Sequence, residues 1–298
     1  MASKVETIIR AAVTAGLQKV ADYNRKKLPA PVGDHPYLTG LHTPLTQEFT
    51  LENLTVEGEL PPSLHGRYLR NGPNPIGRPD PASYHWFSGP GMVHGIAIQD
   101  GKALWYRNRW VRGEEAARYH GEPIPSGPRR KGQDAPNTNV VGLAGRIFAI
   151  VEAGGQPAEL DIELNTISHN DFDGTLAGGF TAHPHHDPLT NEYHAITYRG
   201  DVMNQIWHVV LDDQAHVIRE QPISVNHGPS IHDCAITENY ILIFDLPVTF
   251  SMKSLLKGYS FPYRWNPNHT ARIGLLPRRG ADADVIWIAV EPCYVFHT

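Results

Sequence analysis

The chain has 298 residues, enough to bury a large core within one domain. With 26 basic and 31 acidic residues its formal net charge is −5, which disfavours nucleic acid as a partner. Its two cysteines, Cys234 and Cys293, give no disulfide framework, so we expect a reducing compartment, the cytoplasm. Histidine is the commonest metal ligand among side chains, and the 17 histidines therefore raise the question of a metal site.

Residues 1–44 are expected to form an N-terminal helix followed by an extended lead-in. Apolar residues recur near the helical period in this segment, and Pro29 and Pro31 end the pattern. The first interpretation is a helix that packs on the domain. The alternative is an anchor on a membrane surface, because Lys26 and Lys27 place cations near the apolar face. No apolar run approaches the length of a transmembrane helix.

From residue 45 the pattern changes to short β-rich runs, punctuated by many of the 25 prolines and 27 glycines. The clearest runs are 103–111, 146–152, 193–198, 206–211, 240–246 and 285–290. No amphipathic run of helix length separates them, so residues 45–298 are predicted to form an all-β domain.

The turns that precede several of these runs recur regularly. They begin at Gly101, Gly145, Asn191 and Asn239. The intervals are about 45 residues, which is typical of a β-propeller with several strands in each blade. The segment 250–275 interrupts this repeat and is predicted to be an inserted loop.

A few residues before each of these turns stand His94, Thr138, His183 and His232. Equivalent positions on the innermost strands of successive blades would converge on the propeller axis, where histidines could hold a metal. His297 would be in phase if a turn followed soon after it. A lone histidine in a strand is more often a hydrogen-bonded core residue or a surface residue, and the phase alone does not choose among these histidines.

Eight motifs then identify a family. They are ELPPSLHGRYLRNGPNP (59–75), HWFSGPGMVHGI (85–96), YRNRWVR (106–112), NTNVV (137–141), FTAHPHHDPLTNE (180–192), IHDCAITENY (231–240), LLPRRG (275–280) and EPCYVFHT (291–298). In this order they resemble the carotenoid cleavage oxygenase family, which also includes stilbene dioxygenases and the retinal pigment epithelial membrane proteins. The resemblance covers essentially residues 45–298.

The resemblance implies a seven-bladed β-propeller with Fe(II) on its axis, of which this chain would carry about the first five blades and end before the ring is complete. Four histidines hold the iron in the family. The motifs assign His183, His232 and His297 as three of them, and the fourth has no counterpart here. His94 is not a ligand in the family and is expected to be structural. Thr138 matches a position that faces the open side of the iron in some members.

The resemblance also implies a carboxylate one shell outside the metal, accepting the second ring N–H of a ligand. Glu152 matches such a residue and is expected to pair with His232. The alternative is a strand-end glutamate in water. Where the family usually reads Asp-Gly-Asp-Gly, this chain has Ser-Gly-Pro-Gly at 88–91, so the two glycines are kept and the two carboxylates are lost.

The implied reaction is O2-dependent cleavage of a carbon–carbon double bond to two carbonyl products. A carotenoid or apocarotenoid is the favoured substrate, because Val151 stands where stilbene-cleaving members tend to carry lysine. The alternatives are a lignostilbene-type dioxygenase and an inactive propeller fragment or binding scaffold. Aromatic residues and lysines occur together in the segment 250–265, which fits either peripheral contact with a membrane or a lid over the domain.

Overall fold

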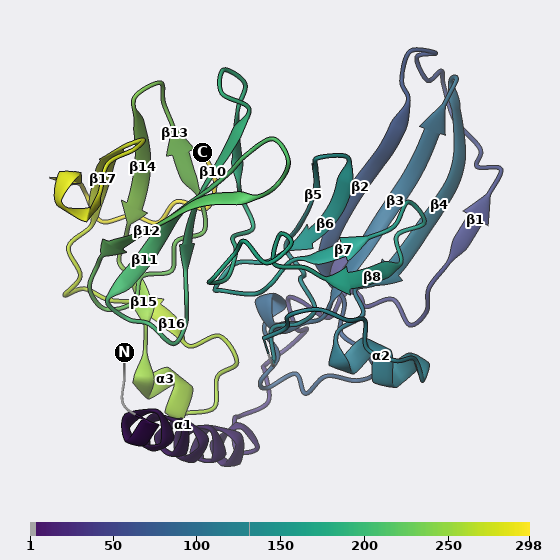
Figure 1. Cartoon of the computed structure of the whole chain (residues 1–298). Coiled ribbons are helices and arrows are strands. Elements are labelled where there is room, and N and C mark those ends of the chain that lie inside the picture. The colour runs from purple at the N-terminus through teal and green to yellow at the C-terminus, as the bar shows by residue number, and fades with distance from the viewer. Residues whose placement is uncertain (1–3, 131) are drawn as a thin grey trace.

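The computed structural model describes residues 4–130 and 132–298, and the side chains from Val13 onward except those of Thr14 and Lys131. Within this part of the chain, four antiparallel sheets of four strands each make up most of the fold (Figure 1). The prediction of an all-β domain is confirmed in its main part, since the described residues are mostly β.

The first sheet has the order β1-β4-β3-β2 and the second the order β5-β6-β7-β8. Their strands are β1 (Thr50–Glu52), β2 (Gly66–Pro73), β3 (Gly91–Gln99), β4 (Lys102–Trp110), β5 (Asn139–Leu143), β6 (Arg146–Ile150), β7 (Ala158–Leu160) and β8 (Thr166–His169). The third sheet has the order β12-β11-β10-β9 and the fourth the order β13-β14-β17-β18. Their strands are β9 (His185–Asp187), β10 (Glu192–Tyr198), β11 (Gln205–Leu211), β12 (Val217–Ser224), β13 (Cys234–Ile236), β14 (Tyr240–Asp245), β17 (Arg272–Pro277) and β18 (Ile286–Ala289).

All six of the predicted β-rich runs form strands, namely β4, β6, β10, β11, β14 and β18. The prediction that helices are absent after residue 45 is wrong at two short places, α2 (Glu114–His120) and α3 (Met252–Leu256). Each is too short to show a helical period. Residues 250–275 are more than a loop, because β15 (Val248–Phe250) and β16 (Tyr263–Trp265) pair on either side of α3.

The predicted repeat is correct for three of its four turns. The turns at Gly145, Asn191 and Asn239 each join an edge strand to its neighbour, in the pairs β5–β6, β9–β10 and β13–β14. The turn at Gly101 instead joins β3 to β4, and β2 is the edge strand next to β3. His94 therefore lies on the second strand from the edge, so it is not equivalent to the residues that precede the edge strands β5, β9 and β13.

Hydrophobic clusters fill the spaces between consecutive sheets. Pairs that share such a cluster are Val93 with Leu160, Phe148 with Val209, and Ile206 with Ile241. All six side chains are almost completely buried. Full burial of one such side chain contributes roughly 1.5–3 kcal/mol, so face-to-face packing of the sheets is the main source of stability.

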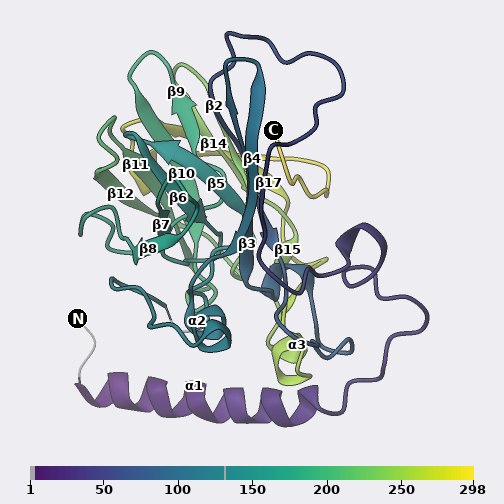
Figure 2. The same cartoon turned by 90° about the vertical axis from the view of Figure 1, so that its right-hand side faces the viewer.

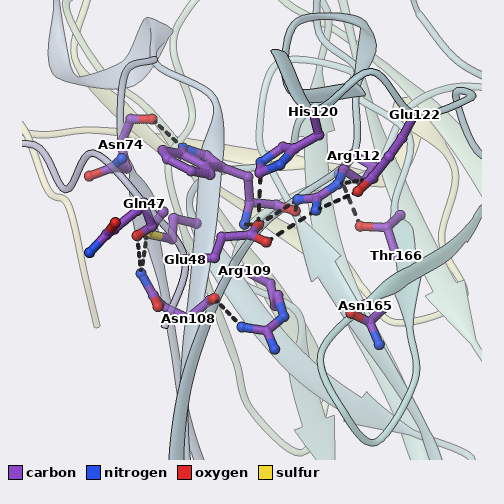
Figure 3. A network of polar contacts seen from close by, with 12 residues as sticks. Gln47, Glu48, Asn74, Asn108, Arg109, Arg112, His120, Glu122, Asn165 and Thr166 are labelled. Atoms are coloured by element: carbon purple, nitrogen blue, oxygen red, sulfur yellow. Dashed lines mark hydrogen bonds and ion pairs between the residues drawn. The ribbon is translucent and has the colours of Figure 1, made fainter. Parts of the chain in front are cut away.

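A network around Arg112 joins the first sheet to the second (Figure 3). The Arg112 guanidinium donates to both carboxylate oxygens of Glu48, at 2.5 and 3.1 Å, and to Glu122 Oε2 at 2.7 Å. Its backbone N–H donates to Thr166 Oγ1 at the start of β8. The hydrogen bond from Arg112 holds the pKa of Glu122 below its usual range. The last arginine of the motif YRNRWVR thus has a structural role.

Helix α1 (Lys4–Arg25) lies across the base of the molecule, close to α3 (Figure 2). Asn24 Nδ2 donates to the carbonyl of Leu256 at 2.7 Å, and Arg25 Nε to that of Gly258 at 3.0 Å. The helix therefore packs on the inserted segment, as the first interpretation expected. Among the residues described, no helix has both the length and the apolar character that crossing a membrane requires.

Candidate metal centre

Three histidines come together because of where their strands lie in the sheets. His183 stands two residues before β9 and His232 two residues before β13, and both strands are edges of their sheets and lie next to each other. His297 follows β18, at the opposite edge of the fourth sheet. The chain returns from there to the other two histidines, and Tyr294 anchors it through a hydrogen bond of 3.1 Å between its hydroxyl and Ser230 Oγ.

The ring nitrogens of His183, His232 and His297 lie within 4.8 Å of one another. His183 Nε2 and His232 Nε2 are 3.0 Å apart. Two nitrogens bonded to one metal ion at about 2.1 Å and at right angles would also be about 3.0 Å apart. The donors present therefore fit a metal ion in both type and spacing.

Burial affects the protonation of His183. The pKa of His183 is lowered to about 4, mainly because its ring is removed from water and further because of the neighbouring His232. The His183 imidazole is therefore neutral near pH 7, which is the form that binds a metal ion.

Glu152 lies directly behind His232. Its Oε2 is 3.2 Å from His232 Nδ1, and its side chain is only 8% exposed. A proton on Nδ1, donated to this carboxylate, leaves the lone pair of Nε2 directed at His183. The alternative of a solvated strand-end glutamate is wrong, since the residue is buried.

Thr138 directly precedes β5 and is held by its neighbour Asn137. The Asn137 amide group donates to the carbonyls of Phe87 at 3.1 Å and Gly89 at 2.6 Å, which turns its oxygen towards Thr138. Thr138 Oγ1 then donates to that oxygen at 3.0 Å. The hydroxyl proton of Thr138 is thus already used.

Gly91, in the Ser-Gly-Pro-Gly segment, approaches the same region closely. A Cβ at this position would lie 1.9 Å from the carbonyl oxygen of Pro136. The backbone of β3 can therefore approach the residues before β5 only if position 91 is glycine. This explains structurally why the glycine is needed although the family's carboxylates are lost.

A cavity of about 600 Å³ opens beside Glu152 and Thr138. Its apolar wall consists of Phe87, Val151, Phe250, Phe261 and Tyr263, and its polar end of Glu114, Glu115, Arg118, Gln133 and Asp134. This shared cavity was not predicted from the sequence, because its walls come from segments that lie far apart along the chain.

His94 lies outside the cluster. Its Nδ1 is 2.8 Å from the Tyr106 hydroxyl on the adjacent strand β4, and burial lowers its pKa. This is the structural role that the motifs indicated. His185, in the same motif as His183, contacts Asp233 instead of the other histidines, with 2.7 Å between Nε2 and Oδ1.

Fold and site together define a mostly β protein with a candidate histidine metal centre at the meeting point of separate sheets. The family model described as retinal pigment epithelial membrane protein matches residues 42–298. The chain belongs to this family, the carotenoid cleavage oxygenases.

Among curated relatives, a carotenoid cleavage oxygenase of Mycobacterium tuberculosis is 42% identical over 90% of this chain. A carotenoid 9,10(9',10')-cleavage dioxygenase 1 of Phaseolus vulgaris is 33% identical over 88%, and an isoeugenol monooxygenase of Pseudomonas nitroreducens is 32% identical over 88%. The chain spans 62%, 54% and 57% of the length of these three relatives.

Solved structures are also similar in fold. A lignostilbene dioxygenase of Pseudomonas brassicacearum aligns with a TM-score of 0.75 and 28% identity, covering 88% of this chain and 57% of that one. A cobalt-substituted apocarotenoid oxygenase of Synechocystis aligns with a TM-score of 0.70 and 26% identity, covering 85% and 58%.

Proposed function

We propose that this chain carries His183, His232 and His297 as ligands of a non-haem Fe(II) ion in a dioxygenase that cleaves a carbon–carbon double bond with O2. The convergence of the three ring nitrogens is the observation that carries the proposal. When bound, the iron would supply the activation of O2, and the products would be two carbonyl compounds. The cobalt-substituted relative supports a metal ion in this fold.

The residues around the three histidines have separate tasks in this proposal. Glu152 accepts a hydrogen bond from His232 Nδ1, which leaves the lone pair of His232 Nε2 free. Thr138 borders the cavity and would face the iron, but its hydroxyl has no proton to spare, because it donates its hydrogen bond to Asn137 Oδ1. The cavity wall of Phe87, Val151 and aromatic residues from the inserted segment holds an apolar substrate away from water.

A carotenoid or apocarotenoid is the substrate class that the cavity favours. Val151, in place of the lysine expected in stilbene-cleaving members, is one of the apolar residues of the cavity wall. The names of the mycobacterial and plant relatives support the same class. A lignostilbene-type reaction is the second candidate, favoured by the likeness to the Pseudomonas structure and by the isoeugenol monooxygenase.

Two further parts of the proposal concern architecture and location. The four sheets, packed face to face, are proposed as successive blades of a seven-bladed β-propeller, with His297 leading into a fifth.

We also propose a cytoplasmic protein in peripheral contact with a membrane. The exposed Tyr23, Met252 and Trp265 lie on α1 and the inserted segment, which also lines the cavity. Sedimentation with anionic vesicles tests this contact, and a protein that stays in the supernatant contradicts it.

The experiment that tests the function uses the full-length protein reconstituted with Fe(II). Carotenoid, apocarotenal and stilbene substrates are supplied in air and the aldehyde products are identified by mass spectrometry. His232→Ala should remove iron and product formation together, whereas the matched His94→Ala should keep the iron. An iron-loaded wild type that forms no aldehyde from any of these substrates would favour the inactive or binding-scaffold alternative.

A further inference from the structure

The carboxylate of Asp233 lies among all three of the segments that carry the clustered histidines. Its Oδ1 is 2.7 Å from His185 Nε2, and its Oδ2 accepts the backbone N–H of Thr298 at 3.1 Å. The same Oδ2 is 3.9 Å from His297 Nδ1. The Asp233 side chain is only 4% exposed, so water does not replace these partners.

Each partner of Asp233 adjoins one of the proposed ligands. His185 follows His183 by two residues at the start of β9, Thr298 follows His297, and Asp233 itself follows His232. One buried carboxylate therefore connects three segments that the sheets bring in from different directions. Hydrogen bonds to an ionised group are stronger than neutral ones, and those in a buried position are not weakened by competing water.

A second metal site is the competing explanation, because His185, Asp233 and Cys234 also offer donor atoms within 4.8 Å of one another. Cys234, however, is only 1% exposed and belongs to a hydrophobic core cluster. Asp233 Oδ1 is also occupied, by His185 and by the backbone N–H of Cys234 at 2.8 Å. A clamp between segments fits these contacts better than a metal site.

We propose that Asp233 is a positioning residue that holds the segments of His183, His232 and His297 together and thereby raises the metal affinity of the centre. The part about metal affinity rests on the proposed function. The part about the segments does not, because the partners of Asp233 are all protein atoms.

The test compares the wild-type full chain with Asp233→Asn, which keeps the size of the side chain but removes its charge. Asp187→Asn is the matched control: the side chain of Asp187 is likewise buried, at 6% exposure, and its partners are Leu189, Thr190 and Arg278. Two readouts are taken: amide hydrogen exchange of the peptide containing Thr298, measured without metal, and Co(II) affinity by competition with a chelating indicator.

Asp233→Asn should speed exchange of that peptide and weaken Co(II) binding by roughly 10–100-fold, the usual cost of an outer partner of a ligand. Asp187→Asn should change neither. Unchanged exchange in Asp233→Asn overturns the inference, whatever the metal result. If wild type binds no Co(II), the proposed metal centre fails and with it the effect on affinity, whereas faster exchange would still establish Asp233 as the clamp.

Discussion

Replacing Glu152 by glutamine tests the link between the buried carboxylate and the metal centre. The change removes the negative charge that faces His232 Nδ1 at 3.2 Å, and it keeps the size of the side chain and one acceptor oxygen. A hydrogen bond to a charged group contributes about 1.5–3 kcal/mol. Since about 1.4 kcal/mol corresponds to a tenfold change in affinity, complete loss would weaken binding by roughly 10–100-fold. We expect Glu152→Gln near the lower end of this range and Glu152→Ala near the upper.

The assay is Fe(II) or Co(II) affinity by chelator competition, with the unfolding midpoint of each metal-free variant measured in parallel. Glu159→Gln is the matched control, because this carboxylate pairs with Arg146 on the neighbouring strand and touches no histidine of the cluster. Its affinity should equal that of wild type. Equal affinities for Glu152→Gln, Glu152→Ala and wild type would refute the reasoning that Glu152 orients a ligand.

The remaining predictions concern stability. Arg112→Met should lower the free energy of unfolding by about 3 kcal/mol in urea, because Glu48 is left largely buried without its partner; no change would mean that the network does not join the two sheets. Gly91→Ala should cost about 1–3 kcal/mol through overpacking, and Gly142→Ala, where a Cβ has room, should cost much less; equal costs would contradict the close approach at Gly91. The pKa of His208 is lowered to about 3, mainly by burial. As the pH falls, His208 is therefore protonated in the unfolded chain at a higher pH than in the folded one. The free energy of unfolding should therefore fall as the pH drops from about 6.5 towards 3. His208→Gln should show a shallower fall in acid unfolding curves. An unchanged slope would exclude His208 as a source of the acid destabilisation.

Much of the fold was predictable because its strands are apolar and short and are separated by glycine and proline. Runs such as 193–198 and 206–211 form β10 and β11 almost residue for residue. The helix α2 was missed because seven residues are too few for a visible period, although Gly121 closes it in the left-handed conformation that favours glycine at a helix end. The error at Gly101 arose because a turn shows where two strands meet but not their place in the sheet.

Only those residues of the candidate site that the family motifs assign were predicted from the sequence. The motifs assigned His183, His232 and His297, and the repeat agreed for the first two. Asp233 was missed although it stands in the same motif as His232, since side chains of adjacent strand residues usually point to opposite faces. Residues 231–233 precede β13 and are not in a strand, so both side chains can take part in the centre.

An anomalous difference map from crystals of the full-length protein loaded with Co(II) would show directly whether the three histidines bind a metal ion. We expect one strong peak within bonding distance of the ring nitrogens of His183, His232 and His297, with Glu152 still hydrogen-bonded to His232. A peak bound elsewhere, for example at His94, or a loaded protein in which His183 and His232 remain in direct contact without a peak, would contradict this expectation.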